Sequence, residues 1–323
     1  MTVDLFLSKA IDVFLIARKA DGYSLSTVAQ YKWGLDRFLL HCGDKKITDY
    51  KINDFRSYLT WLRTEYKPNR KSGNTDPLSS GSLFNAWKAI RSFYLWACQE
   101  YQFPRPDLDW KRPRFEYPEI IPFTKDEINA ILNASEYTAS AKTVNRKPFK
   151  MRRHTSKRDR AIILLLLDSG IRVSECARLK ISDINLIVGE IHVQPFQSSR
   201  KSKPRTVPIS PLTCKSISQY ISLRDYSNQD LLFITRNKQP MNKDSIRLML
   251  NEIGKRANVS DVNPHRFRHT FAIQYLRNGA DIFTLKKILG HSTLKMVEAY
   301  LSIANIDVAS AHRRASPVDN WKL

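Results

Sequence analysis

The densest ionisable chemistry in this sequence lies in its last quarter, where imidazole, guanidinium and phenol side chains follow one another closely. If a helix begins at Pro264, His265 and Arg268 stand three residues apart and project from one face of it. That helix would then offer an imidazole and a guanidinium to the same small anion. The other members of the group are His269, His291 and Tyr300.

Two shorter helices are expected to position the histidine and the tyrosine that follow. Asp281 predicts the cap of a short helix that ends at Gly290 and delivers His291. Residues 293–300 indicate a further helical turn or two, with Tyr300 at the end. Taken singly, the histidine is also explained as a polar cap and the tyrosine as a half-buried packing residue. The combination is what favours chemistry.

An arginine upstream is the expected partner of this group. A seven-residue apolar run, 161–167, is too short to span a bilayer and predicts a buried helix. Gly170 would end that helix, which leaves Arg172 at a tight turn between buried elements. An arginine there is unfavourable unless it is paired, and Glu175 is the expected orienting partner. The alternative is that the two residues form only a structural salt bridge.

The overall charge indicates a polyanionic partner. The chain has 323 residues, a formal net charge of +22 and a hydrophobic fraction of 42%, which is enough for two domains with their own cores. Nucleic acid is the first expectation for such a charge, and an anionic membrane surface is the second. The segment 1–18 carries Asp4 and Asp12, so it is not read as a secretory signal, and we expect a cytoplasmic protein.

No metal or nucleotide cofactor is expected from the sequence. The four cysteines are scattered, without C-x-x-C or zinc-ligand spacing, and we expect them to be reduced and buried. A G-x-x-x-x-G-K-[ST] loop is also missing, so ATP hydrolysis is not implied.

The N-terminal part predicts an all-helical bundle with basic faces. Apolar residues recur at helical spacing over 3–18 and 26–42, after Asn53, and again from Leu83 to Tyr94. The other side of this fourth helix carries Lys88 and Arg91. Such residues are either a solvated surface or a contact with a DNA groove or backbone.

A proline-rich stretch predicts the boundary between two domains. Five prolines lie between residues 103 and 122, with few periodic apolar positions. We therefore predict a helical domain over 1–110, a linker over 111–122 and a second domain over 123–323. In the linker, Lys111, Arg112 and Arg114 could follow phosphates. The second domain would begin with the helix that Thr124 and Glu127 cap as a capping box.

Two basic segments of the second domain are candidates for contact with DNA or the reaction. Residues 139–158 hold eight lysines and arginines, among them Arg152 and Arg153, and form either a solvated loop or a contact with the DNA backbone. Residues 189–193 and 205–209 alternate as strands and predict a hairpin whose tip is Arg200-Lys201-Ser202-Lys203.

Four separated motifs resemble the catalytic signature of the tyrosine recombinase family, the lambda-integrase and Xer-like enzymes. They are Gly170-Ile171-Arg172-x-x-Glu175, then His265-x-x-Arg268-His269, then Leu289-Gly290-His291, and Tyr300 nine residues further on. The resemblance covers the C-terminal three-fifths of the chain. It implies a mainly α fold, with an N-terminal helical, SAM-like core-binding domain and a mixed α/β, mostly helical catalytic domain with a small antiparallel sheet. The two would form a C-shaped DNA clamp.

The resemblance also implies a reaction. Arg172 and Arg268 would grip the oxygens of a phosphodiester, whose pentavalent transition state gathers negative charge. Tyr300 would attack it, with His265 as the candidate for accepting the phenol's proton. His291 would donate to a phosphate oxygen. A hairpin lysine would protonate the departing 5′-oxygen; Lys201 is our assignment, with Arg200 and Lys203 as alternatives.

The expected function is site-specific DNA recombination through a 3′-phosphotyrosyl intermediate, for integration or excision of a mobile element, for transposition, or for resolution. The expected partner is a double-stranded recombination site, bound by a dimer that becomes a tetramer in the synapse through the C-terminal segment. No membrane is involved. Two rivals are a type IB topoisomerase, which relaxes DNA with nearly the same residues, and a non-catalytic architectural DNA-binding protein.

Overall fold

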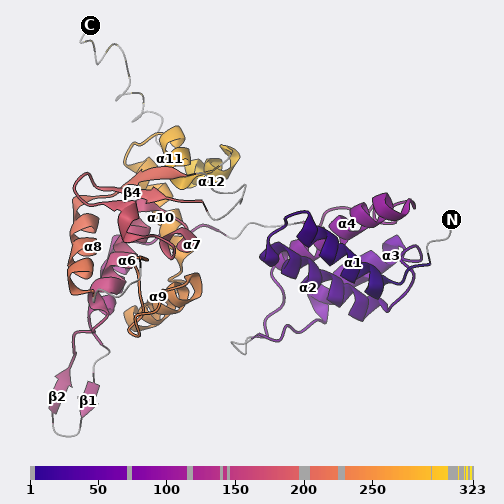
Figure 1. Ribbon diagram of the computed structural model, residues 1–323, viewed down its shortest axis with the longest axis horizontal. Coiled ribbons are helices and arrows are strands. Elements are labelled where there is room, and N and C mark those ends of the chain that lie inside the picture. The colour runs from indigo at the N-terminus through magenta and orange to yellow at the C-terminus, as the bar shows by residue number, and fades with distance from the viewer. Residues whose placement is uncertain are drawn as a thin grey trace. The chain divides into compact units, whose positions relative to one another are not determined.

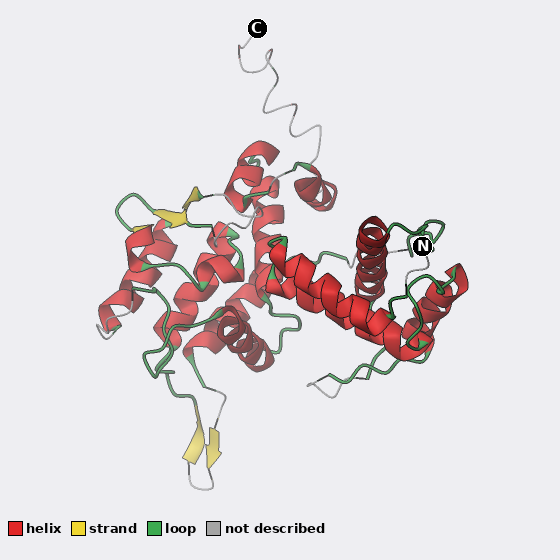
Figure 2. Cartoon of the chain, turned by 45° about the vertical axis from the view of Figure 1, so that its right-hand side comes forward, coloured by secondary structure: helices red, strands yellow, loops and turns green. Residues whose placement is uncertain are grey.

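The computed structural model describes residues 4–70, 75–114, 119–138, 141–143, 146–195, 204–224, 230–291 and 293–304, with the single positions 312, 316, 318 and 321. The chain forms two compact units, Met1–Glu119 and Ile120–Leu323 (Figure 1). Both are built chiefly of helices, and Figure 2 shows how few strands accompany them. The mainly α prediction is therefore confirmed. The division between the units falls within the segment 111–122 that the sequence analysis reads as a linker.

The N-terminal unit is a bundle of helices, two of which begin at a capping serine, whereas the third helix begins one residue before Asn53. Its helices are α1 (Leu7–Ala20), α2 (Leu25–Cys42), α3 (Ile52–Thr64) and α4 (Ser80–Tyr101). The hydroxyl oxygens of Ser24 and Ser79 accept hydrogen bonds from the first turns of α2 and α4. The first helix begins later than the predicted residue 3. The fourth is longer at both ends than its apolar positions indicated.

Aromatic side chains fill the core of this unit. Phe38, Phe55, Tyr58, Phe93 and Tyr94 are all fully buried. Gly34 lets α2 approach α4 closely, because a Cβ atom at that position would lie 2.9 Å from the Cβ of Ala89.

The second unit, Ile120–Leu323, is also mostly helical. Its helices are α5 (Lys125–Glu136), α6 (Ser156–Ser169), α7 (Val173–Cys176), the 3-10 turn η1 (Ile181–Asp183), α8 (Pro211–Leu223), α9 (Lys243–Ala257), α10 (Pro264–Arg277), α11 (Ile282–Leu289) and α12 (Lys295–Ala304). Its strands are β1 (Ala141–Thr143), β2 (Arg146–Phe149), β3 (Ile184–Asn185), β4 (Glu190–Val193) and β5 (Arg205–Pro208). The predicted capping box of α5 is present.

The predicted hairpin forms the main sheet. Strands β3, β4 and β5 are antiparallel in that order, and Ile191 lies opposite Val207 with both side chains buried. The predicted hairpin tip lies outside the described residues. The sequence left the basic segment 139–158 as either a solvated loop or a contact with the DNA backbone. It is not a loop throughout, since β1 and β2 pair there as a second, two-stranded sheet. This hairpin extends away from the helices of its unit (Figures 1 and 2).

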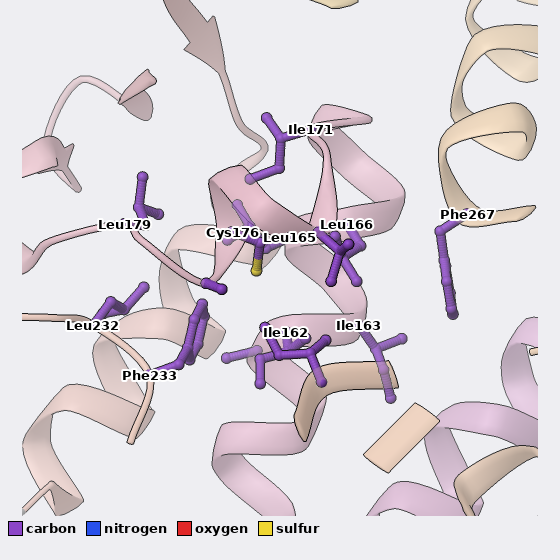
Figure 3. Close-up of a cluster of buried hydrophobic side chains, with 14 of the residues drawn as sticks. Ile162, Ile163, Leu165, Leu166, Ile171, Cys176, Leu179, Leu232, Phe233 and Phe267 are labelled. Atoms are coloured by element: carbon purple, nitrogen blue, oxygen red, sulfur yellow. The ribbon is translucent and has the colours of Figure 1, made fainter. Parts of the chain in front are cut away.

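Helix α6 is the central element of the second core because it is apolar over most of its circumference. Its own Ile162, Ile163, Leu165 and Leu166 share one apolar cluster with side chains from other segments, which are Ile171, Cys176, Leu179, Leu232, Phe233 and Phe267 (Figure 3). A smaller apolar cluster joins α10, α11 and α12. Helices α10 and α12, which carry His265, Arg268, His269 and Tyr300, therefore pack on one another and on α11, which precedes His291.

Two expectations about the chain as a whole can be compared with the structure. None of the helices in the described ranges is both long enough and apolar enough to cross a membrane. All four cysteines are free, but only Cys176 and Cys214 are buried, whereas Cys42 and Cys98 are half-buried. The expectation that all four would be buried was therefore wrong for the pair in the N-terminal unit.

Candidate active site

Arg268 is the buried centre of the site. Its Nη1 donates to the carbonyl oxygen of Gly170 at 2.7 Å, and its Nη2 donates to that of Leu289 at 2.8 Å. These carbonyls end α6 and α11, where the helix dipoles place partial negative charge. Burial and, after it, the positive charge of Arg172 lower the pKa of Arg268 to about 10. The guanidinium thus stays charged at neutral pH and ties two helix ends together.

Glu175 orients two arginines rather than one. Arg172 donates to its carboxylate from the backbone at 2.8 Å and from Nη1 at 3.2 Å. Arg205, on β5, grips the same carboxylate with two bonds, of 3.0 and 2.9 Å. Burial raises the pKa of Glu175, but the bonds and charge of Arg205 and Arg172 outweigh it and hold that pKa at about 2. Spacing in the sequence indicated Arg172 as the partner of Glu175, but not Arg205, which lies 30 residues away.

Two features of the turn after α11 require a glycine at position 290. Its φ of +65° lies in the left-handed region that favours glycine. A Cβ atom there would also lie 3.0 to 3.2 Å from the guanidinium atoms of Arg205. That guanidinium donates from Nε to the carbonyl of Ile288 at 2.6 Å. The turn that presents His291 is therefore built directly against the arginine that holds Glu175.

His291 faces Arg268. Its Nε2 lies 2.6 Å from the Nη2 of Arg268. Because a guanidinium can only donate, Nε2 is the acceptor, and the neutral ring carries its proton on Nδ1. Within the described part of the chain, that buried Nδ1 has no hydrogen-bond partner. Burial and the charges of Arg268 and Arg172 lower the pKa of His291 to about 4, so the ring is neutral at pH 7.

Tyr300, on α12, lies beside His269 and within the electrostatic influence of Arg268 and Arg172. Its side chain is buried, and its hydroxyl lies 2.9 Å from the Nδ1 of His269. Burial raises the pKa of Tyr300, while the charges of Arg268 and Arg172 lower it in part. The sequence analysis named His265 as the candidate acceptor of the phenol's proton. The geometry brings His269 to the phenol instead.

His265 lies on the exposed side of the site. Its ring centroid is 6.5 Å from that of His269. Among the described residues its side chain makes no hydrogen bond, so its position leaves both ring nitrogens available to a ligand. Burial lowers the pKa of His265 most, and the positive charges of Arg247, Arg268 and Arg172 lower it further. The spacing of three within α10 does place His265 and Arg268 at one site, as the sequence indicated.

The hairpin residues of the predicted set cannot be placed. Lys201 lies outside the described residues, as do its alternatives Arg200 and Lys203. Strands β4 and β5 end beside that segment, and Arg205 at the start of β5 is anchored to Glu175.

The predicted DNA-contacting residues fall into two groups. Lys88, Lys111, Arg112, Arg114 and Arg152 are exposed. The other two, Arg91 and Arg153, are half-buried and bonded within their own units. Arg91 donates to the carbonyl of Asp107 at 2.7 Å, and Arg153 donates to the carboxylate of Asp159 at 2.8 Å. Neither guanidinium is fully available to a phosphate.

The arrangement suits chemistry on a phosphate ester. Arg172 and Arg268 provide fixed positive charge, His265 and His291 provide imidazole donors, and Tyr300 provides a hydroxyl nucleophile beside them. Preorganised cationic donors stabilise the charge that develops on the non-bridging oxygens when a phosphodiester is attacked. Within the described ranges no three His, Cys, Asp or Glu side chains gather into a group that could hold a metal ion.

Family models match both units. The model described as Phage integrase family matches residues 122–305, and the model described as Phage integrase, N-terminal SAM-like domain matches residues 11–102.

Curated relatives resemble the chain along nearly its whole length. A protein named Tyrosine recombinase XerC from Staphylococcus carnosus (strain TM300) is 27% identical over 321 residues, which covers 96% of this chain and 98% of the relative. The protein of the same name from Staphylococcus aureus (strain USA300) is 28% identical over 316 residues, covering 95% and 96%.

Solved structures share the fold. The Tn1549 transposon integrase in complex with transposon right end DNA matches with a TM-score of 0.71 and 18% identity, over 97% of this chain and 99% of that one. The XerH site-specific recombinase in its post-cleavage complex with palindromic difH substrate matches with a TM-score of 0.67 and 17% identity, over 98% and 85%.

Proposed function

The chain belongs to the phage integrase family, whose model matches more than half of it, and from this premise we propose that it is a site-specific DNA recombinase that cleaves and rejoins strands as a tyrosine recombinase. One observation carries the proposal. The phenol of Tyr300 is buried beside His269 of α10. The charges of Arg268, on the same helix, and of Arg172, which precedes α7, lower the pKa of the phenol against the effect of burial.

The two arginines would hold the scissile phosphate. Arg172 projects from the turn before α7, and Arg268 is already aimed into the cluster by the helix ends that it joins. On phosphate binding, the bond between Arg268 and His291 would be exchanged for bonds to phosphate oxygens. The negative charge of the phosphate would raise the pKa of His291 and of His265, and so favour their donor forms. Loss of one arginine typically costs about 2.7–4 kcal/mol in the transition state, or 100- to 1000-fold in rate.

Tyr300 would attack the phosphorus. The bond from its phenolic oxygen to phosphorus forms as the bond to the 5′-oxygen breaks. The phenol's proton passes to His265, our proposed base, and the 5′-oxygen takes a proton from a general acid. Lys201 is our proposed acid, with Lys203 and Arg200 as alternatives on the same hairpin tip. The product is a 3′-phosphotyrosyl bond and a free 5′-hydroxyl. Because the phosphodiester energy is kept in that bond, a 5′-hydroxyl from another strand can reverse the step without a nucleotide cofactor.

The proposed partner is a double-stranded recombination site. The net charge of +22 and the exposed cations Lys88, Lys111, Arg112, Arg114 and Arg152 support contact with phosphates. Strand exchange needs two sites, so we propose a dimer on each site and a tetramer in the synapse. The C-terminal segment would join protomers. The place of action would be the cytoplasm, and the biological outcome would be resolution of DNA dimers or movement of a mobile element.

The test is a suicide-substrate assay with the full-length protein. Nicked DNA from the neighbourhood of its own gene would be incubated without metal or ATP, and the products run on a denaturing gel. We expect a protein-linked DNA band that Tyr300→Phe abolishes, and recombinant strands when a second site is added. Supercoil relaxation without recombinants would contradict the proposal in favour of a type IB topoisomerase. DNA binding without any adduct would contradict it in favour of an architectural protein.

A further inference from the structure

His269 has no part in the reaction outlined above, although it makes the closest contact with its nucleophile. We propose that His269 is a positioning residue for Tyr300: its Nδ1 accepts the hydroxyl hydrogen and fixes the phenolic oxygen beside the cationic group. The inference rests on the proposed function, because it assigns a role in the same reaction. It differs from the expectation that His265 serves the phenol.

The packing of α12 explains why such a residue is needed. Helix α12 is held against α10 and α11 by an apolar cluster that includes Ile273, Leu289 and Val297. Apolar contacts are not directional, so they hold the helix without fixing where the phenolic oxygen points. A hydrogen bond is directional. In the described part of the chain, the bond of 2.9 Å to His269 is the hydrogen bond that the Tyr300 hydroxyl makes.

The chemistry of the two groups decides who donates. Burial and, after it, the charges of His265 and Arg268 lower the pKa of His269 to about 4. The ring is therefore neutral at pH 7, with one nitrogen free to accept. Because the buried Tyr300 hydroxyl makes no other hydrogen bond among the described residues, its hydrogen goes to Nδ1, which is the acceptor. The ring is also a weak base, so in the resting enzyme the phenol keeps its proton. The hydrogen points to His269, which leaves the lone pairs of the phenolic oxygen free for an incoming phosphorus atom.

The scaffold makes this contact specific to one position of α10. His265 and His269 are four residues apart, about one helical turn, with ring centroids separated by 6.5 Å. The ring centroid of His269 is 5.6 Å from that of Tyr300. His265, a turn earlier, is on the exposed side that a ligand would approach. His269 therefore faces Tyr300, and His265 faces the side from which a phosphate would approach.

The experiment compares His269→Ala with His269→Asn. The asparagine side-chain oxygen can occupy roughly the position of Nδ1 and accept the phenol's hydrogen, but it cannot take up a proton. Single-turnover adduct formation is measured on nicked DNA at saturating concentration, so that rate is separated from binding. A displacement of about 1 Å in a reacting group can cost about 100-fold. We expect His269→Ala to lose about 10- to 100-fold in rate, and His269→Asn to recover most of that loss, with unchanged DNA affinity.

A matched control uses His192 on β4, whose Nδ1 makes a similar bond of 3.0 Å to the hydroxyl of Thr206 at the surface. His192→Ala should leave the rate unchanged. The proposal is overturned if His269→Ala keeps the wild-type rate, or if His269→Asn melts like the wild type and is as slow as the alanine variant. Should His269→Ala not fold, the asparagine variant decides alone: if it melts like the wild type and forms the adduct at least 10-fold more slowly than the wild type, the proposal is overturned. A wild type that forms no adduct would instead refute the proposed function.

Discussion

The two compact units of the chain have cores of different chemical character. The N-terminal core is rich in rings: Phe38 packs against Tyr50, Phe55 and Tyr58 with ring centroids 5.1 to 5.5 Å apart. Its described part buries one charged side chain, Asp107. The core of the second unit is mostly aliphatic. The described part of that unit buries four charged side chains, which are Asp159, Glu175, Arg224 and Arg268.

This difference separates scaffold from chemistry. A core of rings is stable without exact pairing of charges, whereas a buried charge is tolerated only while its partners remain. In the second unit the same bonds stabilise the fold and orient the site, since Glu175 and Arg268 join α6, α7, β5 and the end of α11. Damage to the first unit should therefore lower stability alone. Damage to the buried charges of the second should lower stability and reaction rate together.

The largest expected effect is that of Glu175→Ala. It leaves the buried guanidinium of Arg205 without its carboxylate, and breaking a buried ion pair in this way costs about 3–5 kcal/mol. Hydrogen exchange of peptides from each unit would locate the loss in the second unit, and adduct formation should fall with it. The control is Asp244→Ala, which removes an exposed pair with Arg247 and should cost about 1 kcal/mol or less. Equal losses in the two variants would refute the distinction.

Phe38→Ala tests the other side of the comparison. Removing the Phe38 ring from this aromatic core should lower the free energy of unfolding by about 3–5 kcal/mol, because the neighbouring side chains cannot refill the cavity. Hydrogen exchange should increase in the N-terminal unit only. At a temperature where both units remain folded, the single-turnover rate on saturating DNA should match the wild type. A lower rate under those conditions would show that damage to the N-terminal core also affects the reaction, and would contradict the comparison.

Gly290→Ala sharpens the comparison at a single backbone position. A non-glycine residue in the left-handed region costs about 1–2 kcal/mol, and here the new methyl group also crowds the guanidinium of Arg205. Gly22→Ala is the matched control in the N-terminal unit: its φ is +77°, and a Cβ atom there meets nothing within 4 Å. Gly290→Ala should lose more stability than Gly22→Ala, measured by urea unfolding followed unit by unit. Only Gly290→Ala should also slow adduct formation.

A further prediction concerns acid. The folded-state pKa values of His269 and His291 are about 4, below the ordinary value of 6.5, so the unfolded chain binds protons first as the pH falls. The free energy of unfolding of the second unit should therefore decrease between pH 6.5 and 4, and Glu175, with a pKa of about 2, should extend that decrease below pH 4.5. The double variant His269→Asn and His291→Asn should show a shallower decrease in the upper range. An identical slope would contradict the assignment.

Local signals in the sequence predicted much of the site's framework. Asn263 accepts from the first turn of α10 and Asp281 from that of α11, as their positions indicated. Gly170 and Gly290 end helices in the left-handed conformation. The pairing of Arg172 with Glu175 spans three residues, so spacing alone could suggest it.

Contacts between distant segments were not predictable in this way. Arg205 meets Glu175 across 30 residues, and Tyr300 meets His269 across 31. Which of two histidines on α10 faces the phenol depends on how α12 packs, and no periodicity in the sequence encodes that rotation. Similarly, Arg91 and Arg153 looked like surface cations because the carbonyl and carboxylate that hold them lie elsewhere in the chain. A hint was available for Arg205, since it begins a predicted strand beside the hairpin tip.

The most direct test of the central claim is to find which residue carries the DNA. The covalent adduct from a nicked suicide substrate would be digested with nuclease and trypsin and analysed by mass spectrometry. The tryptic peptide that covers residues 296–313 contains one tyrosine, Tyr300, so a nucleotide mass on it identifies the nucleophile without ambiguity. The account predicts a 3′-linked nucleotide on that peptide and a free 5′-hydroxyl on the released strand. A nucleotide on any other peptide, or a 5′ linkage, would contradict it.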